Sequence, residues 1–179
     1  NADYGIALTI ADNSYMWMVS ATFLDFKNKT EITDSPMGFF SFGKLKLPNT
    51  SQTGDIVFKK KKYEFNFLNE NGNRHLIVKM KEFGHDQVPF EVDLKLTPTN
   101  KDSMVIATPF NKNGHFYYNQ KINLLKADGF AKVGANKYDF SNAYGVLDWG
   151  RGVWTYKNTW YWSSMNAIYN GERIGWNLG

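Results

Sequence analysis

The stretch Phe90-Glu91-Val92-Asp93-Leu94-Lys95-Leu96 decides the fold class, because apolar and charged side chains alternate along its whole length. Successive side chains of a β-strand point to opposite faces of a sheet, so this alternation produces one buried face and one solvated face. The same period of two recurs in residues 44–47, 63–68 and 76–81. The sequence therefore predicts several half-buried strands.

Segments typical of tight turns separate the predicted strands. Asn71-Gly72 and Asn170-Gly171 are strong hairpin signals, because both residues of an Asn-Gly pair tolerate positive φ. We expect Asn170-Gly171 to join strands over residues 160–169 and 173–178, and Asp128-Gly129 to join strands over residues 117–125 and 130–133. No segment combines a helical period with helix caps. An antiparallel sheet of this length must protect its edges, which predicts an all-β barrel or a strongly curved antiparallel sheet.

The composition excludes several kinds of site. The chain has 179 residues, no cysteine, and three histidines whose spacing is unlike that of a zinc site, so we expect neither a disulfide nor a metal. No glycine-rich phosphate or dinucleotide loop is present, and we expect no cofactor. The net charge of +4 is modest and arginine is scarce, which argues against nucleic acid as a partner. No apolar run is long enough for a membrane-spanning helix.

Both ends of the chain read as strands, the first over residues 4–10 and the last over residues 174–179. We therefore expect residues 1–179 to be a single β domain that belongs to a longer protein. Its partner would be the remainder of that protein or a second copy of the domain, because an unpaired strand edge favours association. The lack of cysteine and of a signal peptide favours a cytoplasmic location.

Five of the six tryptophans lie between Trp149 and Trp176, and this block also holds two of the three arginines. Its centre reads Gly145-Val146-Leu147-Asp148-Trp149-Gly150-Arg151-Gly152-Val153-Trp154, and Trp160-Tyr161-Trp162 follows. One carboxylate and one guanidinium, those of Asp148 and Arg151, are thus set among large rings. Such a combination predicts a concave site lined by aromatic side chains.

The chain resembles a known family through these same residues. The tryptophan block, Phe116-Tyr117-Tyr118-Asn119-Gln120-Lys121 and the ending Gly175-Trp176-Asn177-Leu178-Gly179 are similar to the hallmark of domain of unknown function family 2804, over most of the chain. More remotely, the order Tyr-Tyr-polar, glycine hairpin and Gly-x-x-Asp-Trp resembles lipocalin-like proteins of the carotenoid hydratase and Diels–Alderase kind. That resemblance implies a calycin-like or lipocalin-like barrel with an apolar ligand. The spacing around the aspartate differs from theirs, so no catalytic role is transferred.

Three functions are compatible with the tryptophan block. The first is a binding module for a small apolar or amphipathic molecule, with ligand-binding residues Tyr117, Tyr118, Trp149, Arg151, Trp154, Trp160 and Trp162. The second is an isomerase, hydratase or cyclase acting on a hydrophobic substrate, in which Asp148 is the catalytic proton donor or base and Arg151 holds its charge state. The third is a carbohydrate-binding module that uses exposed tryptophans. Alternatively, Asp148 and Arg151 form a structural ion pair that pins a β-bulge.

Overall fold

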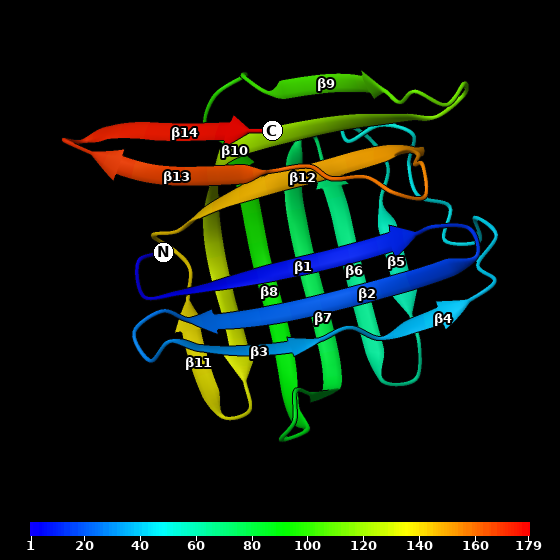
Figure 1. Cartoon of the computed structure of the whole chain (residues 1–179). Coiled ribbons are helices and arrows are strands. Elements are labelled where there is room, and N and C mark those ends of the chain that lie inside the picture. The colour runs from blue at the N-terminus through cyan, green and yellow to red at the C-terminus, as the bar shows by residue number, and fades with distance from the viewer. The chain divides into compact units, whose positions relative to one another are not determined.

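The structure is a computed structural model that describes residues 1–179, and it contains strands but no helix (Figure 1). The sheets are antiparallel, which confirms the predicted all-β antiparallel class. The chain divides into two compact units, residues 1–96 with 127–143, and residues 97–126 with 144–179. Strand β10 (Phe116–Val133) contributes one half to each unit.

Two antiparallel sheets make up the first unit. One has the order β1-β2-β3, with β4 also paired to β2, and its strands are β1 (Tyr4–Asp12), β2 (Met16–Asp25), β3 (Thr30–Asp34) and β4 (Met37–Phe39). The other has the order β11-β10-β8-β7-β6-β5, and its further strands are β5 (Ile56–Lys59), β6 (Tyr63–Glu70), β7 (Asn73–Phe83), β8 (Val88–Pro98) and β11 (Asn136–Asp139). In Figure 1, β1–β3 cross β6–β8 at a steep angle, as in orthogonal sheet packing.

The second sheet is open at β5 and β11, and no closed barrel is detected. The calycin-like barrel therefore stays a prediction.

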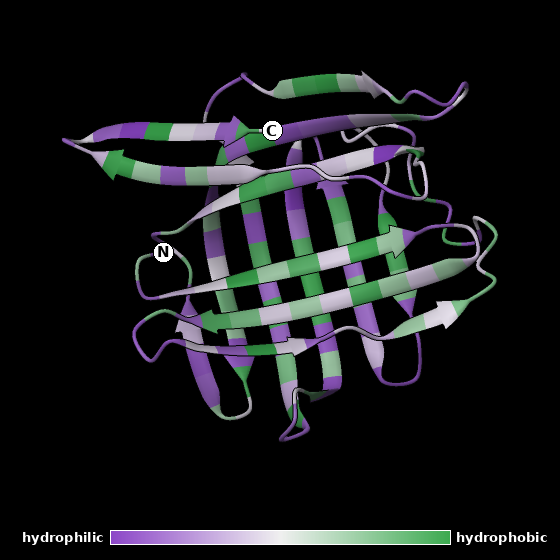
Figure 2. Ribbon diagram, viewed as in Figure 1, coloured by the Kyte–Doolittle hydropathy of each residue, from purple (hydrophilic) through white to green (hydrophobic).

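Alternation along the strands builds the core of the first unit, as the colour changes along β6–β8 in Figure 2 show. Phe90, Val92 and Leu94 of β8 are buried, and the intervening charged side chains lie on the other face. This outcome confirms the expectation from the alternating stretch. The sheets meet through buried apolar side chains of both, because each sheet has one apolar face to remove from water.

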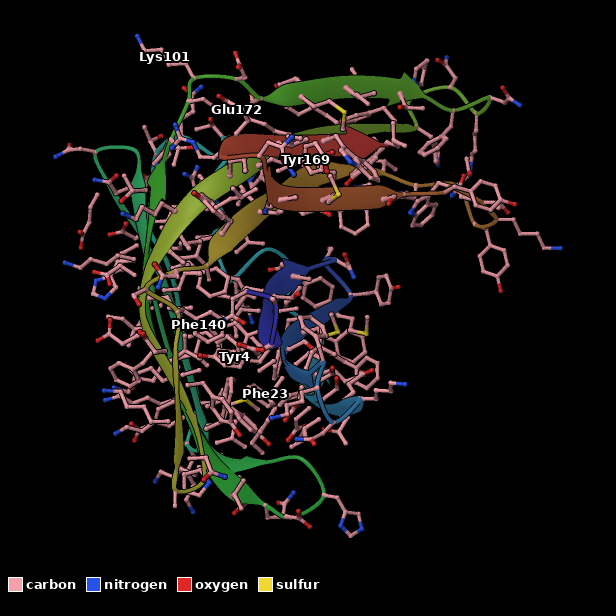
Figure 3. The ribbon with its side chains drawn as sticks, turned by 90° about the vertical axis from the view of Figure 1, so that its left-hand side faces the viewer. Tyr4, Phe23, Lys101, Phe140, Tyr169 and Glu172 are labelled. Atoms are coloured by element: carbon pink, nitrogen blue, oxygen red, sulfur yellow. The ribbon has the colours of Figure 1, made fainter.

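Aromatic rings join the start of the chain to the strand β11 region. The ring of Tyr4 lies 5.2 Å from that of Phe140, and the ring of Phe23 lies 4.5 Å from that of Tyr138, measured between centroids. Figure 3 shows Tyr4, Phe23 and Phe140 converging between the two sheets. These contacts span more than a hundred residues of sequence, so the first unit is closed by its last segment, residues 127–143.

The predicted turn at Asp128-Gly129 is wrong, because β10 continues through it to Val133. Gly129 has a φ of +127°, and a Cβ atom there would lie 2.1 Å from the backbone oxygen of Asp93. The glycine is needed for a close approach between two backbones within the sheet, not for a chain reversal. A glycine beside an aspartate looks the same in sequence in both cases.

The strand predicted over residues 44–47 is also wrong. Phe42, Gly43 and Lys46 have positive φ, so the chain forms consecutive turns where two leucines alternate with two lysines. The loop predicted over residues 48–54 is present.

The second unit consists of two pieces of sheet. β9 (Met104–Pro109) and β12 (Tyr144–Val153) flank the first half of β10, and β13 (Ser163–Tyr169) pairs with β14 (Glu172–Leu178). Asn170-Gly171 forms the turn of this hairpin, as predicted. β13 begins at Ser163, however, so Trp160 and Trp162 lie in the loop before it and not in the strand predicted over residues 160–169.

Candidate functional site

Polar side chains line both faces of the first half of β10. The pairing of β10 with β12 is regular from Phe116 to Ile122, so the side chains of each strand alternate between two faces. One face carries Tyr117, Asn119 and Lys121 of β10, opposite Gly152, Gly150 and Asp148 of β12. We call it the lysine face. The other face carries Tyr118 and Gln120, opposite Arg151 and Trp149.

Lys121 is the central residue of the lysine face. The residue is only 5% exposed, and its ammonium donates a hydrogen bond to Oδ1 of Asp148 on the paired strand. Nζ also lies 5.2 Å from the centre of the Trp162 ring, within the range of a cation–π interaction. A lysine this deeply buried requires such partners, because removal of an unpaired ammonium from water is costly.

Asn119, two residues before Lys121 on the same face, has an unused hydrogen-bond acceptor. The residue is 5% exposed, and its Oδ1 is buried without a hydrogen-bond partner. A buried acceptor in this state costs about 1–3 kcal/mol, and native structures contain few of them. The lysine face therefore presents both a buried donor, the Lys121 ammonium, and an unsatisfied acceptor to any polar group that reaches it.

Tyr117 forms the end of the lysine face. Its ring lies over Gly150, where an added Cβ would be 2.6 Å from the phenol oxygen, and its centroid is 5.2 Å from the Trp154 ring. Burial raises the pKa of the Tyr117 phenol, and the negative charge of Asp148 raises it further. Gly150 thus leaves the space that the tyrosine ring fills.

Asn123 anchors the β13–β14 hairpin at the other end of the face. Its Nδ2 donates to the carbonyl oxygen of Met165 at 3.0 Å and to Oδ1 of Asn166 at 2.9 Å, and its Oδ1 accepts from Nδ2 of Asn177. Asn166 in turn donates to the carbonyl oxygen of Gly145 in β12 at 3.2 Å. These amides fix the hairpin against β10 and β12. Trp162 is the residue immediately before β13.

The structure divides the predicted site residues between the two faces. Asp148, Tyr117, Trp154 and Trp162 belong to the lysine face or contact it. Tyr118 and Trp149 meet edge to face on the other side, at 5.8 Å. Trp160 lies in the loop before β13 and is 70% exposed.

The predicted pairing of Asp148 with Arg151 relied on a bulge between them. β12 has no register shift there, so the two side chains leave opposite faces of the strand. The cation that meets Asp148 is Lys121 instead.

Sequence reasoning missed Asn119, Lys121 and Asn123. Their signal was a strand segment with no apolar face, since Tyr118 and Gln120 alternate with Asn119 and Lys121. Such a strand has no apolar side to bury, and here the side of Asn119 and Lys121 is buried, which indicates a polar interior or a binding site.

Large rings are exposed in the loop between β12 and β13. Trp154 is 41% exposed and Trp162 is 49% exposed, and the rings of Tyr156, Trp160 and Tyr161 between them are more exposed still. Residues 156–159 border an open depression in the same loop. Exposed aromatic side chains in this number are unusual for a surface without a binding role.

Comparison with known proteins places the chain in a family. The model of the family described as a domain of unknown function, DUF2804, matches residues 1–179. The chain belongs to the DUF2804 family. No curated protein and no solved structure matches it.

Two further observations apply to this DUF2804 chain. No three or more histidine, cysteine, aspartate or glutamate side chains gather closely enough to hold a metal ion. A helix with the length and apolarity needed to cross a bilayer is absent.

Proposed function

We propose that this DUF2804 chain is a lipocalin-like binding module for a small amphipathic molecule, and that the lysine face holds the polar head of that molecule. The observation that carries the proposal is the burial of Lys121 beside an unsatisfied Asn119 carboxamide. A core that served only for packing would place apolar side chains at these positions. Ligand sites, in contrast, combine an apolar lining with a few polar groups that fix orientation.

The chemistry of the face indicates which head group fits. The Lys121 ammonium has three hydrogens. One is donated to Asp148 and the ammonium also lies over the Trp162 ring, so a further hydrogen can be donated to an oxygen of the ligand. Asn119 Oδ1 accepts a hydrogen bond, so the same head group also needs a donor. A hydroxyl group, or a carboxylate with a hydroxyl group beside it, satisfies both demands.

The rings beside the face supply apolar contacts for the rest of the ligand. Trp154 contacts Tyr117 at one end, and Trp162 covers Lys121. Both tryptophans are partly exposed, so a bound apolar chain would remove their surfaces from water. The arrangement supports an amphipathic ligand over a purely apolar one.

Asp148 favours binding over catalysis. Its carboxylate is engaged by an ammonium and its side chain is 46% exposed. A catalytic proton donor is more often a carboxyl group in an apolar setting, away from a cation. The isomerase, hydratase or cyclase function therefore has less support than binding.

Carbohydrate binding is the second candidate. Trp160 is 70% exposed and Tyr161 is 87% exposed, next to the depression formed by residues 156–159. Rings open to solvent are available for stacking on sugar rings. Binding of a soluble oligosaccharide that is lost in Trp160→Ala, but kept in Lys121→Met, would support this candidate.

The proposal is tested with two dyes of similar size. Anilinonaphthalene sulfonate is an anionic amphiphile, and phenylnaphthylamine is its uncharged counterpart. The rise in dye fluorescence on binding reports occupancy for both dyes. Lys121→Met should weaken the anionic dye about tenfold or more, because a charge-assisted hydrogen bond contributes about 1.5–3 kcal/mol, and should affect the uncharged dye less.

Lys132→Met is the matched control. Lys132 is also on β10, also pairs with a carboxylate (Glu91, 3.5 Å) and also lies over an aromatic ring (Phe130, 5.4 Å), but its side chain is 42% exposed. Equal effects of the two substitutions would contradict the proposal. Asp148→Asn removes the negative charge beside the site and keeps the Lys121 ammonium. This variant should bind the anionic dye at least as well as the unchanged protein, because the hydrogen-bond donor remains and a repelling charge is gone.

A further inference from the structure

A second surface, in the first unit, presents apolar rings to solvent. Residues 37–46, which we call the basic aromatic loop, follow β3 and include β4. Phe39 and Phe40 are each 67% exposed and Phe42 is 65% exposed, and Met37 adds a further apolar side chain at 55%. The three rings form one cluster, with centroids 6.3 Å apart for the first pair and 5.7 Å for the second.

The backbone of the loop holds these rings outward at a cost. Phe40 has a φ of 61° and Phe42 a φ of 48°, in the left-handed region where asparagine or glycine is favoured and a bulky residue is strained. Strain of this kind persists only where the surroundings impose it, and it gathers at functional positions. A loop with no role for its rings would be more stable with asparagine at both positions.

Asp12 and Ser41 impose the conformation. Ser41 is buried between the exposed rings, and its Oγ donates to Oδ1 of Asp12 at 2.6 Å. Backbone bonds run from Phe40 N to Tyr15 O and from Phe42 N to Ser14 O, both at 2.6 Å. The rings are therefore presented on a fixed frame, and a surface that binds them orders little additional backbone.

The charged side chains within the loop are all basic, and the Asp12 carboxylate beneath the loop is engaged by Ser41 and Leu45. Residues 35–54 contain Lys44 and Lys46, both exposed, and no aspartate or glutamate. Lys60 adds a third ammonium, 5.5 Å from the ring of Trp17, and that tryptophan is packed against Gly38 of β4. Apolar rings at the tip with lysines beside them are complementary to a surface that is apolar inside and anionic outside.

We propose that the basic aromatic loop docks on the surface of a lipid bilayer that contains anionic lipids. Phe39, Phe40 and Phe42 enter the boundary between head groups and acyl chains, and Lys44 and Lys46 contact the anionic head groups. Shallow insertion of apolar side chains beside basic ones is the physical basis of such interfacial binding. This docking goes beyond the proposed ligand site, and it involves different residues in the other unit.

Flotation of the full chain with vesicles tests the docking. The vesicles contain either phosphatidylcholine alone or about three parts phosphatidylcholine to one part phosphatidylserine. The chain should float with the mixed vesicles at low salt, much less with phosphatidylcholine alone, and less again as salt screens the lysines. No flotation with the mixed vesicles, or equal flotation with both kinds, would overturn the proposal.

The decisive variant is Phe40→Asn with Phe42→Asn. Asparagine suits positive φ, so this variant should fold at least as well as the unchanged chain and lose vesicle binding about tenfold or more. Lys44→Gln with Lys46→Asn should weaken binding to the mixed vesicles about fivefold for each lysine, since a basic residue near an anionic surface contributes about 1 kcal/mol.

Tyr169→Ser provides the matched control. Tyr169 is also 67% exposed, but it stands opposite Glu172 in the β13–β14 hairpin, as Figure 3 shows. The Tyr169→Ser variant should bind the mixed vesicles as strongly as the unchanged chain. Lys121→Met should also bind them as strongly, and this result separates surface docking from capture of a lipid on the lysine face. If the double asparagine variant binds like the unchanged chain, or if it only converts a dimer to a monomer in sedimentation, the loop is not a lipid-binding surface.

Discussion

Lys121 and Asp148 form an ion pair whose two side chains differ sharply in exposure, at 6% for the lysine and 46% for the aspartate. The two halves of this pair should therefore differ in what their loss does to stability. Asp148→Ala leaves a buried ammonium without its carboxylate, at a cost of about 2 kcal/mol, between the values for exposed and for buried pairs. Lys121→Met leaves a carboxylate that water already reaches, at about 1 kcal/mol or less. Urea unfolding of both variants measures the difference, and equal losses would show that burial of the lysine does not matter.

The Tyr117 phenol should ionise at higher pH than a free tyrosine. Burial raises its pKa above 10.0, and the charge of Asp148 adds to the effect. Because the folded pKa is raised, the stabilisation is complete below the unfolded pKa and is lost as pH rises through the folded one. Subtracting the alkaline absorbance titration of Tyr117→Phe from that of the unchanged chain isolates this group. In Asp148→Asn the pKa should fall part of the way back, and no change there would remove the aspartate as a cause.

Asp12 should make the stability of the first unit depend on pH in acid. Burial raises the pKa of this carboxyl, but hydrogen bonds from Ser41 Oγ and from the backbone N–H groups of Ser14 and Leu45 outweigh it, so the pKa lies below 3.8. A lowered folded pKa gives stabilisation that is present above about pH 3.8 and lost as pH falls through the folded value. Asp12→Asn should cost about 1 kcal/mol at neutral pH. The gap between the two unfolding free energies should close in acid, and a constant gap would contradict this role.

Gly150 and Gly152 of β12 should respond differently to alanine. A Cβ at Gly152 would lie 2.2 Å from the backbone oxygen of Phe116, which is fixed by strand pairing. A Cβ at Gly150 would meet the Tyr117 ring, which can rotate. Gly152→Ala should therefore cost about 3 kcal/mol and Gly150→Ala about 1 kcal/mol. If the ring is the obstacle, Gly150→Ala should cost nothing further in a Tyr117→Ala background, and additive losses there would refute the contact.

The period of two was sufficient to predict the strands that form the core. Phe90, Val92 and Leu94 are buried because side-chain direction in a strand follows position alone. Hairpin turns at Asn71-Gly72 and Asn170-Gly171 were likewise predictable from local backbone preference. The role of Gly129 was not predictable, because the carbonyl oxygen of Asp93 that requires a glycine there belongs to a strand far away in the sequence.

The candidate site was predicted only in part, for a related reason. Asp148, Trp154 and Trp162 were found because they belong to a conspicuous block of rings. The partner of Asp148 was missed because Lys121 is set beside it by pairing between strands, and local spacing favoured Arg151. Asn119 looks like any polar strand residue until its burial is known.

The interleaved path of the chain through its two units has a consequence for synthesis on the ribosome. Residues 1–96 need residues 127–143 to cover Tyr4 and Phe23. Residues 97–126 need residues 144–179 to complete the second unit, where β12 pairs with β10. Neither unit can finish folding before segments of the other have emerged, so the first unit stays partly open until residue 143 has been made, and the second unit stays partly open for longer. Long-range closure of this kind is slow and leaves apolar edges exposed to other chains in the meantime. A nascent chain stalled before Phe140 should therefore be held by chaperones, and an amber stop just after Ala143 should release a first unit that has every strand it needs.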